Sequence, residues 1–357
     1  MIHFNYQSQL KLITTFSNLL SSSLNTSLFL VAFMLLNLNL SAQPGSIQWE
    51  NNYGGSDLDV AGSIQKTNDG GYIVAGASLS DNGDVSGNNG NIDSWLVKLD
   101  ASGMIQWEGN YGGSSDDAAQ SIQQTDDGGY IIAGSSNSND GNVSGNNGDR
   151  DFWVVKVDSA GNIEWEDNYG GSSDDIPRSI QQTDDGGYIV AGSSESDDGD
   201  VSGNNGDDDY WLVKVDSNGN IEWEDNYGGS FGETVWSVQQ TADGGYILAG
   251  QSESDDGDVS GNNGLEDYWV IKVDGIGNIE WENNYGGSGE DVAYSVQQTN
   301  DGGYILAGDL FFGNNEVAEY WLVKVDSTGN IEWEDNYGGS DDEVARSVQQ
   351  TEDGGYI

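Results

Sequence analysis

The chain has 357 residues, of which 61 are acidic and 10 are basic, and its formal net charge at pH 7 is −51. So negative a surface repels nucleic acid and anionic membranes, and we exclude both as direct partners. The absence of cysteine removes disulfides, zinc–thiolate sites and cysteine nucleophiles. The one histidine, His3, lies in the leader described next, so the rest of the chain cannot form a Ser-His-Asp triad or common transition-metal sites.

Residues 1–42 differ in composition from the rest, with no aspartate or glutamate and an apolar run from Leu28 to Leu36. The run is too short to span a bilayer, and small residues suited to cleavage follow it around Ala42. We predict a signal peptide over residues 1–42, hence a secreted or cell-surface protein with no membrane insertion after its removal. An uncleaved anchor is the alternative, since the segment is long and has one basic residue, Lys11.

Residues 43–357 form one repeat domain. The motif I-[QE]-W-E recurs at intervals of 58 residues four times and then 52, starting at Ile47, Ile105, Ile163, Ile221, Ile279 and Ile331. A period of this length is typical of arrays in which each unit buries its apolar faces against its neighbours.

Each unit predicts four short strands and no helix. In the clearest copy the strands are Ser179–Thr183, Tyr188–Ser194, Tyr210–Asp216 and Asn220–Tyr227. Gly-rich turns join the first strand to the second and the third to the fourth, which is typical of hairpins. We predict an all-β fold, a β-propeller of four-stranded antiparallel blades. A β-solenoid is the alternative, but solenoid units are shorter and lack regular hairpins.

Five complete units begin at Ser63, Ser121, Ser179, Ser237 and Ser295. A lone fourth strand, Ile47–Tyr53, precedes them, and a lone first strand with the start of a second, Ser347–Ile357, follows them. We predict that these pieces make a sixth, partial blade shared by the termini. Because the chain stops inside a repeat, we expect a C-terminally truncated, monomeric domain whose intact form has six or more blades.

Two repeated residue types indicate packing roles. Eleven of the twelve tryptophans occupy two repeat positions, one in the third strand and one in the fourth, and we predict that they pack between blades. One lysine recurs in the third strand, as in Lys214. We expect each of these lysines to lie between blades and to pair with a carboxylate of the G-G-S-x-x-D stretch.

The loop between the second and third strands is rich in oxygen ligands, as in SDDGDVSGNNGDDD from Ser196. Such groups suit a hard cation, so calcium binding is one interpretation of the loop, and no cofactor is required. Its candidate ligands in two units are Asp198, Asp200, Ser202, Asn204, Asp209, Asp256, Asp258, Ser260, Asn262 and Asp267. Because the pattern departs from an EF-hand loop, we favour the other interpretation, a turn array without an ion in which the side chains bind their own backbone.

The fifth unit replaces this loop with a shorter, more apolar one, Gly308–Tyr320. A departure from the repeat is a candidate contact for a partner, although we favour a simple deletion as its explanation.

The stretches Y-G-G-S-x-x-D (Tyr111–Asp117), D-G-G-Y-I-[VIL]-A-G (Asp185–Gly192), D-Y-W-L-V-K-V-D (Asp209–Asp216) and G-N-I-E-W (Gly219–Trp223) resemble the SBBP-type β-propeller repeats of bacterial, Bacteroidetes-like surface proteins. The resemblance covers nearly all of Ile47–Ile357. It implies an exported propeller, in chains that often use type IX secretion, and it supplies no catalytic residues.

Three functions remain in view. The first is a non-enzymatic adhesion scaffold that binds an extracellular glycan or protein, with calcium stabilisation. The second is a polysaccharide-acting enzyme with two carboxylates, and the third is a passive spacer of a larger secreted protein. We favour the first, with no catalytic residues, because the residues unique to one unit form no recognisable acid–base pair: Arg150, Pro177, Arg178, Phe231, Glu233, Trp236 and Tyr294.

Overall fold

The computed structural model describes residues 47–311 and 317–357. The signal-peptide prediction for residues 1–42 lies outside them. The chain divides into two units, Met1–Asn51 and Asn52–Ile357, and every strand among the described residues lies in the second. No helix in the described part of the chain has the length and apolarity of a membrane span.

Twenty strands form five sheets, which we call blades 1 to 5. Blade 1 contains β1 (Asp59–Lys66), β2 (Tyr72–Ser78), β3 (Asp93–Leu99) and β4 (Ile105–Tyr111). Blade 2 contains β5 (Asp117–Gln124), β6 (Tyr130–Ser136), β7 (Asp151–Val157) and β8 (Ile163–Tyr169). Blade 3 contains β9 (Asp175–Gln182), β10 (Tyr188–Ser194), β11 (Asp209–Val215) and β12 (Ile221–Tyr227). Blade 4 contains β13 (Glu233–Gln240), β14 (Tyr246–Ser252), β15 (Asp267–Val273) and β16 (Ile279–Tyr285). Blade 5 contains β17 (Val292–Gln298), β18 (Tyr304–Phe311), β19 (Ala318–Val325) and β20 (Ile331–Tyr337).

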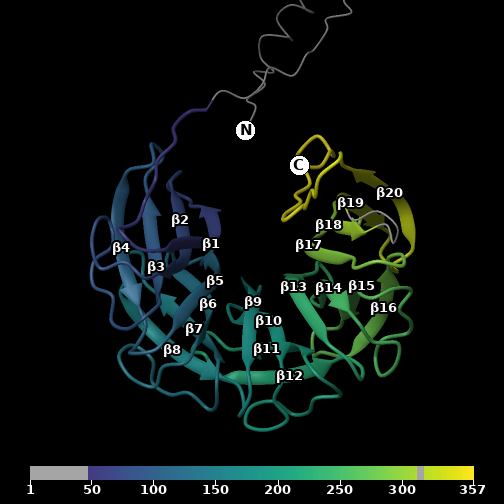
Figure 1. Ribbon diagram of the computed structural model, residues 1–357, viewed down its shortest axis with the longest axis horizontal. Coiled ribbons are helices and arrows are strands. Elements are labelled where there is room, and N and C mark those ends of the chain that lie inside the picture. Colours follow the sequence, from purple (N-terminus) through teal and green to yellow (C-terminus); the bar gives the residue numbers. More distant parts are fainter. Residues whose placement is uncertain (1–46, 312–316) are drawn as a thin grey trace, which may run out of the picture. The chain divides into compact units, whose positions relative to one another are not determined.

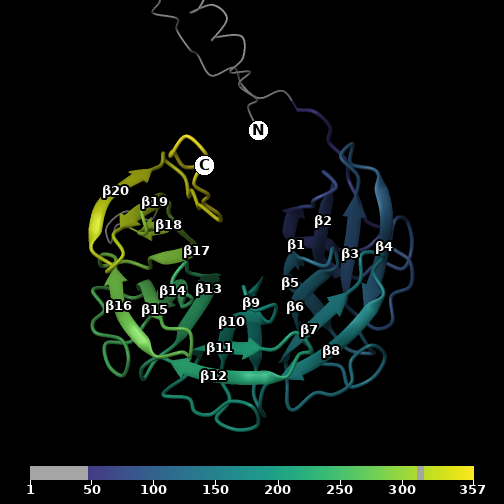
Figure 2. The same cartoon turned by 180° about the vertical axis from the view of Figure 1, so that it is seen from behind.

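Each blade is an antiparallel meander, with its strands paired in chain order. Within the unit Asn52–Ile357 the blades stand side by side around an axis, with β1, β5, β9, β13 and β17 innermost and β4, β8, β12, β16 and β20 outermost (Figure 1). The view from behind shows the same open ring (Figure 2). This arrangement is a β-propeller with five complete blades, as the sequence predicts.

The first strand of each blade is longer than predicted. In blade 3, β10 has the predicted bounds, whereas β9 begins at Asp175, four residues before the predicted start. A β-bulge interrupts its pairing: Ala191 faces Ser179 and Gly192 faces Pro177, so Arg178 is the extra residue. Because aspartate and proline are rare inside paired strands, the sequence of the first half of this strand is typical of a turn.

The segments at the two ends of the described array differ in structure. Residues Ser347–Ile357 form a narrow hairpin in which the Gln349 and Ile357 backbones exchange two 2.9 Å hydrogen bonds. Val348 packs there against the core of blade 5. At the other end, the Tyr53 hydroxyl donates a 2.5 Å bond to the Gly103 carbonyl of blade 1. The predicted strand Ile47–Tyr53 is wrong, because this segment has no strand pairing.

The tryptophans pack between blades, as predicted. Trp211 in β11 is fully buried, and its ring lies 4.6 Å from that of Phe152 in blade 2. Trp223 in β12 contacts Tyr246 of blade 4 at 5.9 Å. The same contact recurs between Trp333 and the C-terminal hairpin. A core that lies between neighbouring sheets explains why a single unit cannot fold alone.

The repeated lysines are buried, but their partners differ from the prediction. Lys214 Nζ lies 3.0 Å from Asp185 in the turn between β9 and β10, and 2.8 Å from Glu222 in β12. Both carboxylates belong to the same blade as the lysine. The predicted partner, in the stretch that follows Lys214, is Glu233, which instead accepts hydrogen bonds from the Ser252 hydroxyl and the Gly229 N–H. Its place at the start of the first strand of blade 4 keeps it away from the lysine.

Candidate functional site

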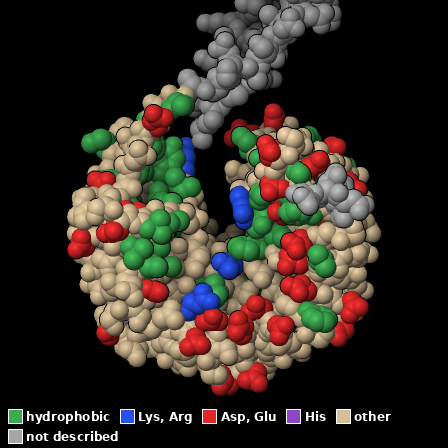
Figure 3. Space-filling view, in the orientation of Figure 1, with side chains coloured by type: hydrophobic (Ala, Val, Ile, Leu, Met, Phe, Trp, Pro, Cys, Tyr) green, Lys and Arg blue, Asp and Glu red, His purple; other side chains and the backbone are tan. Residues whose placement is uncertain are grey.

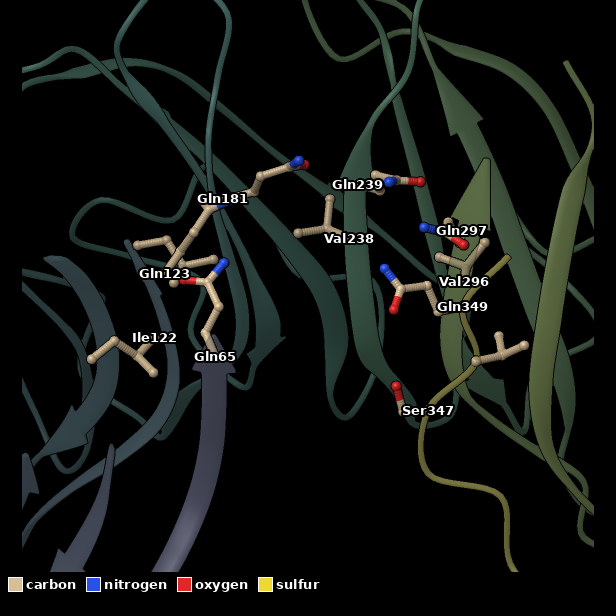
Figure 4. A pocket seen from close by; sticks show the side chains of 12 residues that line it. Gln65, Ile122, Gln123, Gln181, Val238, Gln239, Val296, Gln297, Ser347 and Gln349 are labelled. Atoms are coloured by element: carbon tan, nitrogen blue, oxygen red, sulfur yellow. The ribbon is translucent and has the colours of Figure 1, made fainter. Parts of the chain in front are cut away.

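A channel of about 310 Å³ lies between the innermost strands. Figure 4 shows its wall, where Gln181 and Gln239 extend from neighbouring strands and apolar residues such as Val238 stand between them. The repeated S-[IV]-Q-Q sequence places one such glutamine and one such apolar residue in every blade. The glutamines of this wall are Gln65, Gln123, Gln181, Gln239, Gln297 and Gln349.

Hydrogen bonds between neighbouring blades fix these glutamines. Gln181 Oε1 accepts a 2.6 Å bond from the Gln240 N–H of blade 4, and Gln123 accepts a 2.5 Å bond from the Gln182 N–H of blade 3. The next glutamine of each strand bonds the opposite way, as Gln240 Oε1 accepts from the Asp184 N–H. Each of the inner strands β5, β9, β13 and β17 is therefore bonded to both neighbours, and these bonds fix the orientation of the Gln65, Gln123, Gln181, Gln239 and Gln297 amides.

The positions at which the repeats differ most gather at one end of the channel. We call this group the variable rim. It has three positions in each blade: the bulge residue of the first strand, the penultimate residue of the second strand, and the residue just before the third strand. Acidic residues of the adjoining loops also belong to it. These three positions hold Gln120, Ser135 and Arg150 in blade 2, Arg178, Ser193 and Asp208 in blade 3, and Trp236, Gln251 and Glu266 in blade 4.

Contacts between these side chains show that they form one surface. Trp236 Nε1 donates a 3.1 Å hydrogen bond to Gln251, whose Nε2 donates a 2.8 Å bond to Glu266. In blade 2, Gln120 bonds Ser135 in the same way. Residues scattered over the sequence thus meet because the bulge brings the first strand next to the loop ends.

Three bulge residues stack along the rim together with Arg346, which holds the corresponding place before the C-terminal hairpin. We call the series Arg178, Trp236, Tyr294 and Arg346 the arc. The Arg178 guanidinium lies 4.5 Å from the centre of the Trp236 ring, and the Arg346 guanidinium lies 3.9 Å from that of Tyr294. The two rings meet edge-on at 5.3 Å. Cation–π contacts therefore close both ends of an aromatic pair.

Basic side chains are rare, and the three arginines, Arg150, Arg178 and Arg346, lie at this site. The repeated lysines are buried, and Figure 3 shows the basic side chains of this face along the inner edge of the ring. Arg150 is bound by Asp174 at 3.0 and 2.5 Å. Arg178 and Arg346 form no ion pair with any described residue, and the buried Arg178 Nε has no hydrogen-bond partner there. Burial lowers the pKa of Arg178.

The rim also holds a perturbed acid. Burial, with repulsion from Glu253 and Glu290, raises the pKa of Glu266 to about 7. The carboxyl is held in place by the Gln251 amide. Such a group exchanges a proton near neutral pH.

The predicted loop carboxylates bind backbone amides of the preceding connection. Asp198 Oδ1 accepts a 2.7 Å bond from the Ser172 N–H, and Asp200 Oδ2 accepts a 3.3 Å bond from the Gly170 N–H. The equivalent residues of blade 4 make the same bonds: Asp256 and Asp258. The loop between the second and third strands therefore contacts the connection that leads into the same blade.

The remaining predicted ligands also bond within the loop. The Ser202 N–H points to Glu224 at 3.4 Å, Asn204 Nδ2 donates to the Ser194 carbonyl at 3.1 Å, and the fully buried Asp209 accepts a 2.7 Å bond from the Asn205 N–H. Their equivalents in blade 4 are Ser260, Asn262 and Asp267. Over the described residues, no three acidic or histidine side chains converge as a metal site would require. The arrangement has the form of the turn array, and calcium binding stays a prediction.

The sequence analysis did not predict a pair of buried carboxyl groups at the boundary between two blades. Asp151 and Asp175 are both fully buried, and a Cβ placed on Gly170 would lie 2.6 Å from an oxygen of each. The two carboxyl groups therefore face the same point, which only glycine leaves free. The repeated G-G-S-x-x-D pattern, whose last residue is one of the two carboxylates, was the sequence feature that could have indicated this pair.

The fifth loop is described only in part. Leu310 and Phe311 extend β18 and pair with Glu319 and Ala318 of β19, and Leu310 packs against the core between blades 4 and 5. Residues 312–316, at the centre of the candidate partner contact, lie outside the described residues.

No protein-family model and no curated protein sequence matches the chain. Among solved structures, a protein of unknown function from Bacteroides caccae is 12% identical, with a TM-score of 0.47 over 78% of this chain and 81% of that one. The Pan2 WD40 domain of Neurospora crassa is 10% identical, with a TM-score of 0.44 over 82% and 83%. Sqt1 from Chaetomium thermophilum is 11% identical, with a TM-score of 0.42 over 82% and 75%. The strand pairing itself defines the β-propeller, and these likenesses say nothing of ligand or activity.

Proposed function

We propose that this chain is an exported, non-enzymatic β-propeller scaffold that binds an extracellular glycan or protein at its variable rim, as the resemblance to SBBP-type surface repeats suggests. The observation that carries the proposal is the gathering of the variable positions. Near-identical units supply the same core and the same channel wall, while their differing side chains share one surface. A rigid repeated framework with its differences on one face is typical of binding proteins.

The proposed test is a binding screen of the full chain against immobilised polysaccharides and surface proteins. The decisive variant replaces both Trp236 and Tyr294 with glutamine. Glutamine is chosen because blade 2 already has it at this position, as Gln120. We expect the variant to fold and to lose the ligand. Phe231→Ser is the matched control, because Phe231 is half exposed and its counterpart in blade 3 is Ser173.

Two results would contradict the proposal. Binding that survives the double variant would place the ligand elsewhere on the molecule. A wild-type chain that binds nothing on the array would favour the passive-spacer function.

A carboxylate enzyme is the second candidate, and Glu266 is the observation that favours it. A carboxyl group with a pKa of about 7 beside aromatic residues has the properties of a general acid. Release of reducing ends from polysaccharide by the wild type, abolished by Glu266→Gln, would support this function. We expect no such release.

A further inference from the structure

The channel wall presents hydrogen-bond donors and few acceptors. The Oε1 atoms of Gln65, Gln123, Gln181, Gln239 and Gln297 each accept a backbone N–H of the next blade. Their Nε2 groups have no acceptor among the described residues. Because the backbone hydrogen bond fixes the orientation of each amide, its Nε2 group stays available to a ligand. The channel therefore offers a ring of N–H donors, and a ligand that fits it must supply oxygen acceptors.

The arc adds charged donors at the mouth of this channel. Arg178 lies three residues before Gln181 on the same strand, about 10 Å along it at most. Its guanidinium stacks on Trp236 and forms no ion pair with a described carboxylate, although the charge of Asp208 on the same rim acts on it. A planar guanidinium in this state is suited to bidentate binding of a carboxylate. In a chain with 61 acidic residues, an unpaired arginine is unusual.

The surrounding charge limits what anion can bind. The acidic surface repels a polyanion. At physiological ionic strength, however, exposed charges farther than about 8 Å away are largely screened, so the local guanidinium decides the binding of a single carboxylate. A ligand with one anionic group in an otherwise neutral chain therefore fits, and a dense polyanion does not.

The size and lining of the channel favour a sugar. A volume of about 310 Å³ lies at the small end of ligand sites. Amide donors on several blades can meet several hydroxyl and ring oxygens of one ligand, and the valine and isoleucine side chains between them can pack against C–H groups. A peptide end offers one carboxylate and few further oxygens, and so leaves most of the ring of amides unused.

We propose that the channel and the arc bind a single uronic acid unit of an otherwise neutral glycan. Its carboxylate binds the Arg178 guanidinium, with Arg346 available at the far end of the arc, and its hydroxyl oxygens accept from the channel glutamines. This inference rests on the proposed function and specifies its ligand class.

The test is calorimetric titration of the full chain with methyl glucuronide, methyl glucoside and an acetylated alanine tripeptide with a free carboxylate. We expect the uronide to bind about tenfold more tightly than the glucoside, and more tightly than the peptide. Arg178→Gln should abolish this preference. Arg178→Lys should restore part of it, because the charge returns without the planar fork.

A pair of identical substitutions separates a local effect from general charge. Gln181→Glu keeps the acceptor for the Gln240 N–H but puts a carboxylate in the channel wall, and it should weaken uronide binding more than glucoside binding. Gln106→Glu makes the same change in the outermost strand of blade 1, where other blades already have glutamate, and should leave both unchanged. Thermal unfolding of each variant confirms that it is folded.

Each contrary result has a distinct meaning. Equal affinities for uronide and glucoside, or tighter binding of the peptide, would overturn the uronate inference and leave the binding scaffold intact. Equal losses from Gln181→Glu and Gln106→Glu would also overturn it. If no probe binds the wild type the inference falls, and the array screen decides the proposed function independently.

Discussion

The hydroxyl of Tyr227, the last residue of β12, donates a 2.6 Å hydrogen bond to the carbonyl of Gly277 in blade 4. Both atoms are buried, and Gly277 has a φ of 90°, which favours glycine. The same link joins each complete blade to the next, and Tyr53 makes it with blade 1. A tyrosine hydroxyl therefore connects the outer edges of the blades at each of these boundaries.

Tyr227→Phe should lower the free energy of unfolding by about 1 kcal/mol, because it removes a buried hydrogen bond and leaves the Gly277 carbonyl unpaired. Urea unfolding of the full chain measures this change. Tyr337→Phe is the control, since Tyr337 is half exposed at the end of blade 5 and should cost almost nothing. Equal costs at the two positions would show that the hydroxyl bond does not stabilise the boundary.

Loss of both partners of Lys214 should be costly. Asp185→Asn with Glu222→Gln leaves a buried ammonium group without a counter-charge, and we expect a loss of about 2 kcal/mol, reduced from the usual range because both carboxylates are half exposed. Adding Lys214→Met should recover most of the loss. Glu222→Gln alone should have a small effect, because Lys98 already faces Gln106 instead of glutamate. Failure of Lys214→Met to rescue would contradict this account.

Stability should fall with rising pH through the titration of Asp151. Burial raises the pKa of this carboxyl to about 6, whereas an unfolded aspartate titrates near about 3.9. The folded state therefore holds the proton more tightly, and the resulting stability is complete below about pH 4 and is lost as the pH rises through about 6. Asp151→Asn should flatten the dependence of the unfolding free energy on pH between these values. Asp126→Asn, at an exposed position, should not, and parallel curves for all three proteins would refute the assignment.

Chelation should decide between the calcium site and the turn array. Because the loop carboxylates already accept backbone N–H groups, we expect a chelator to leave the melting temperature unchanged. A fall of several degrees that is absent in the Asp200→Ala, Asp258→Ala double variant would instead support calcium binding. Scanning calorimetry with and without chelator gives the answer.

The architecture was predictable because each unit repeats the same local signals. Alternating residues and Gly-rich turns gave β10 its correct bounds, and the fixed tryptophans pointed to cores between blades. The start of β9 was not predictable, because Pro177 conceals a strand that continues through a bulge. The lysine partner was also wrong, since sequence does not show which end of a strand each acid occupies.

The rim was harder to foresee than the fold. Arg178, Trp236 and Tyr294 were recognised as unusual, but they lie 58 residues apart and no local pattern connects them. Only the spatial neighbourhood of successive bulges brings them together. Comparing the repeats position by position would have shown that they share one place in the unit, although not that their rings stack.

The bulge has a consequence for how such a molecule acquires new partners. The bulge residue has no cross-strand partner, so strand pairing restricts its side chain less than it restricts the other residues of the strand. Glycine, glutamine, arginine, tryptophan and tyrosine already occupy it in successive blades. Randomising this one position in every blade would therefore vary the proposed binding surface while leaving the strand pairing intact, so the chain is a natural starting point for a combinatorial library.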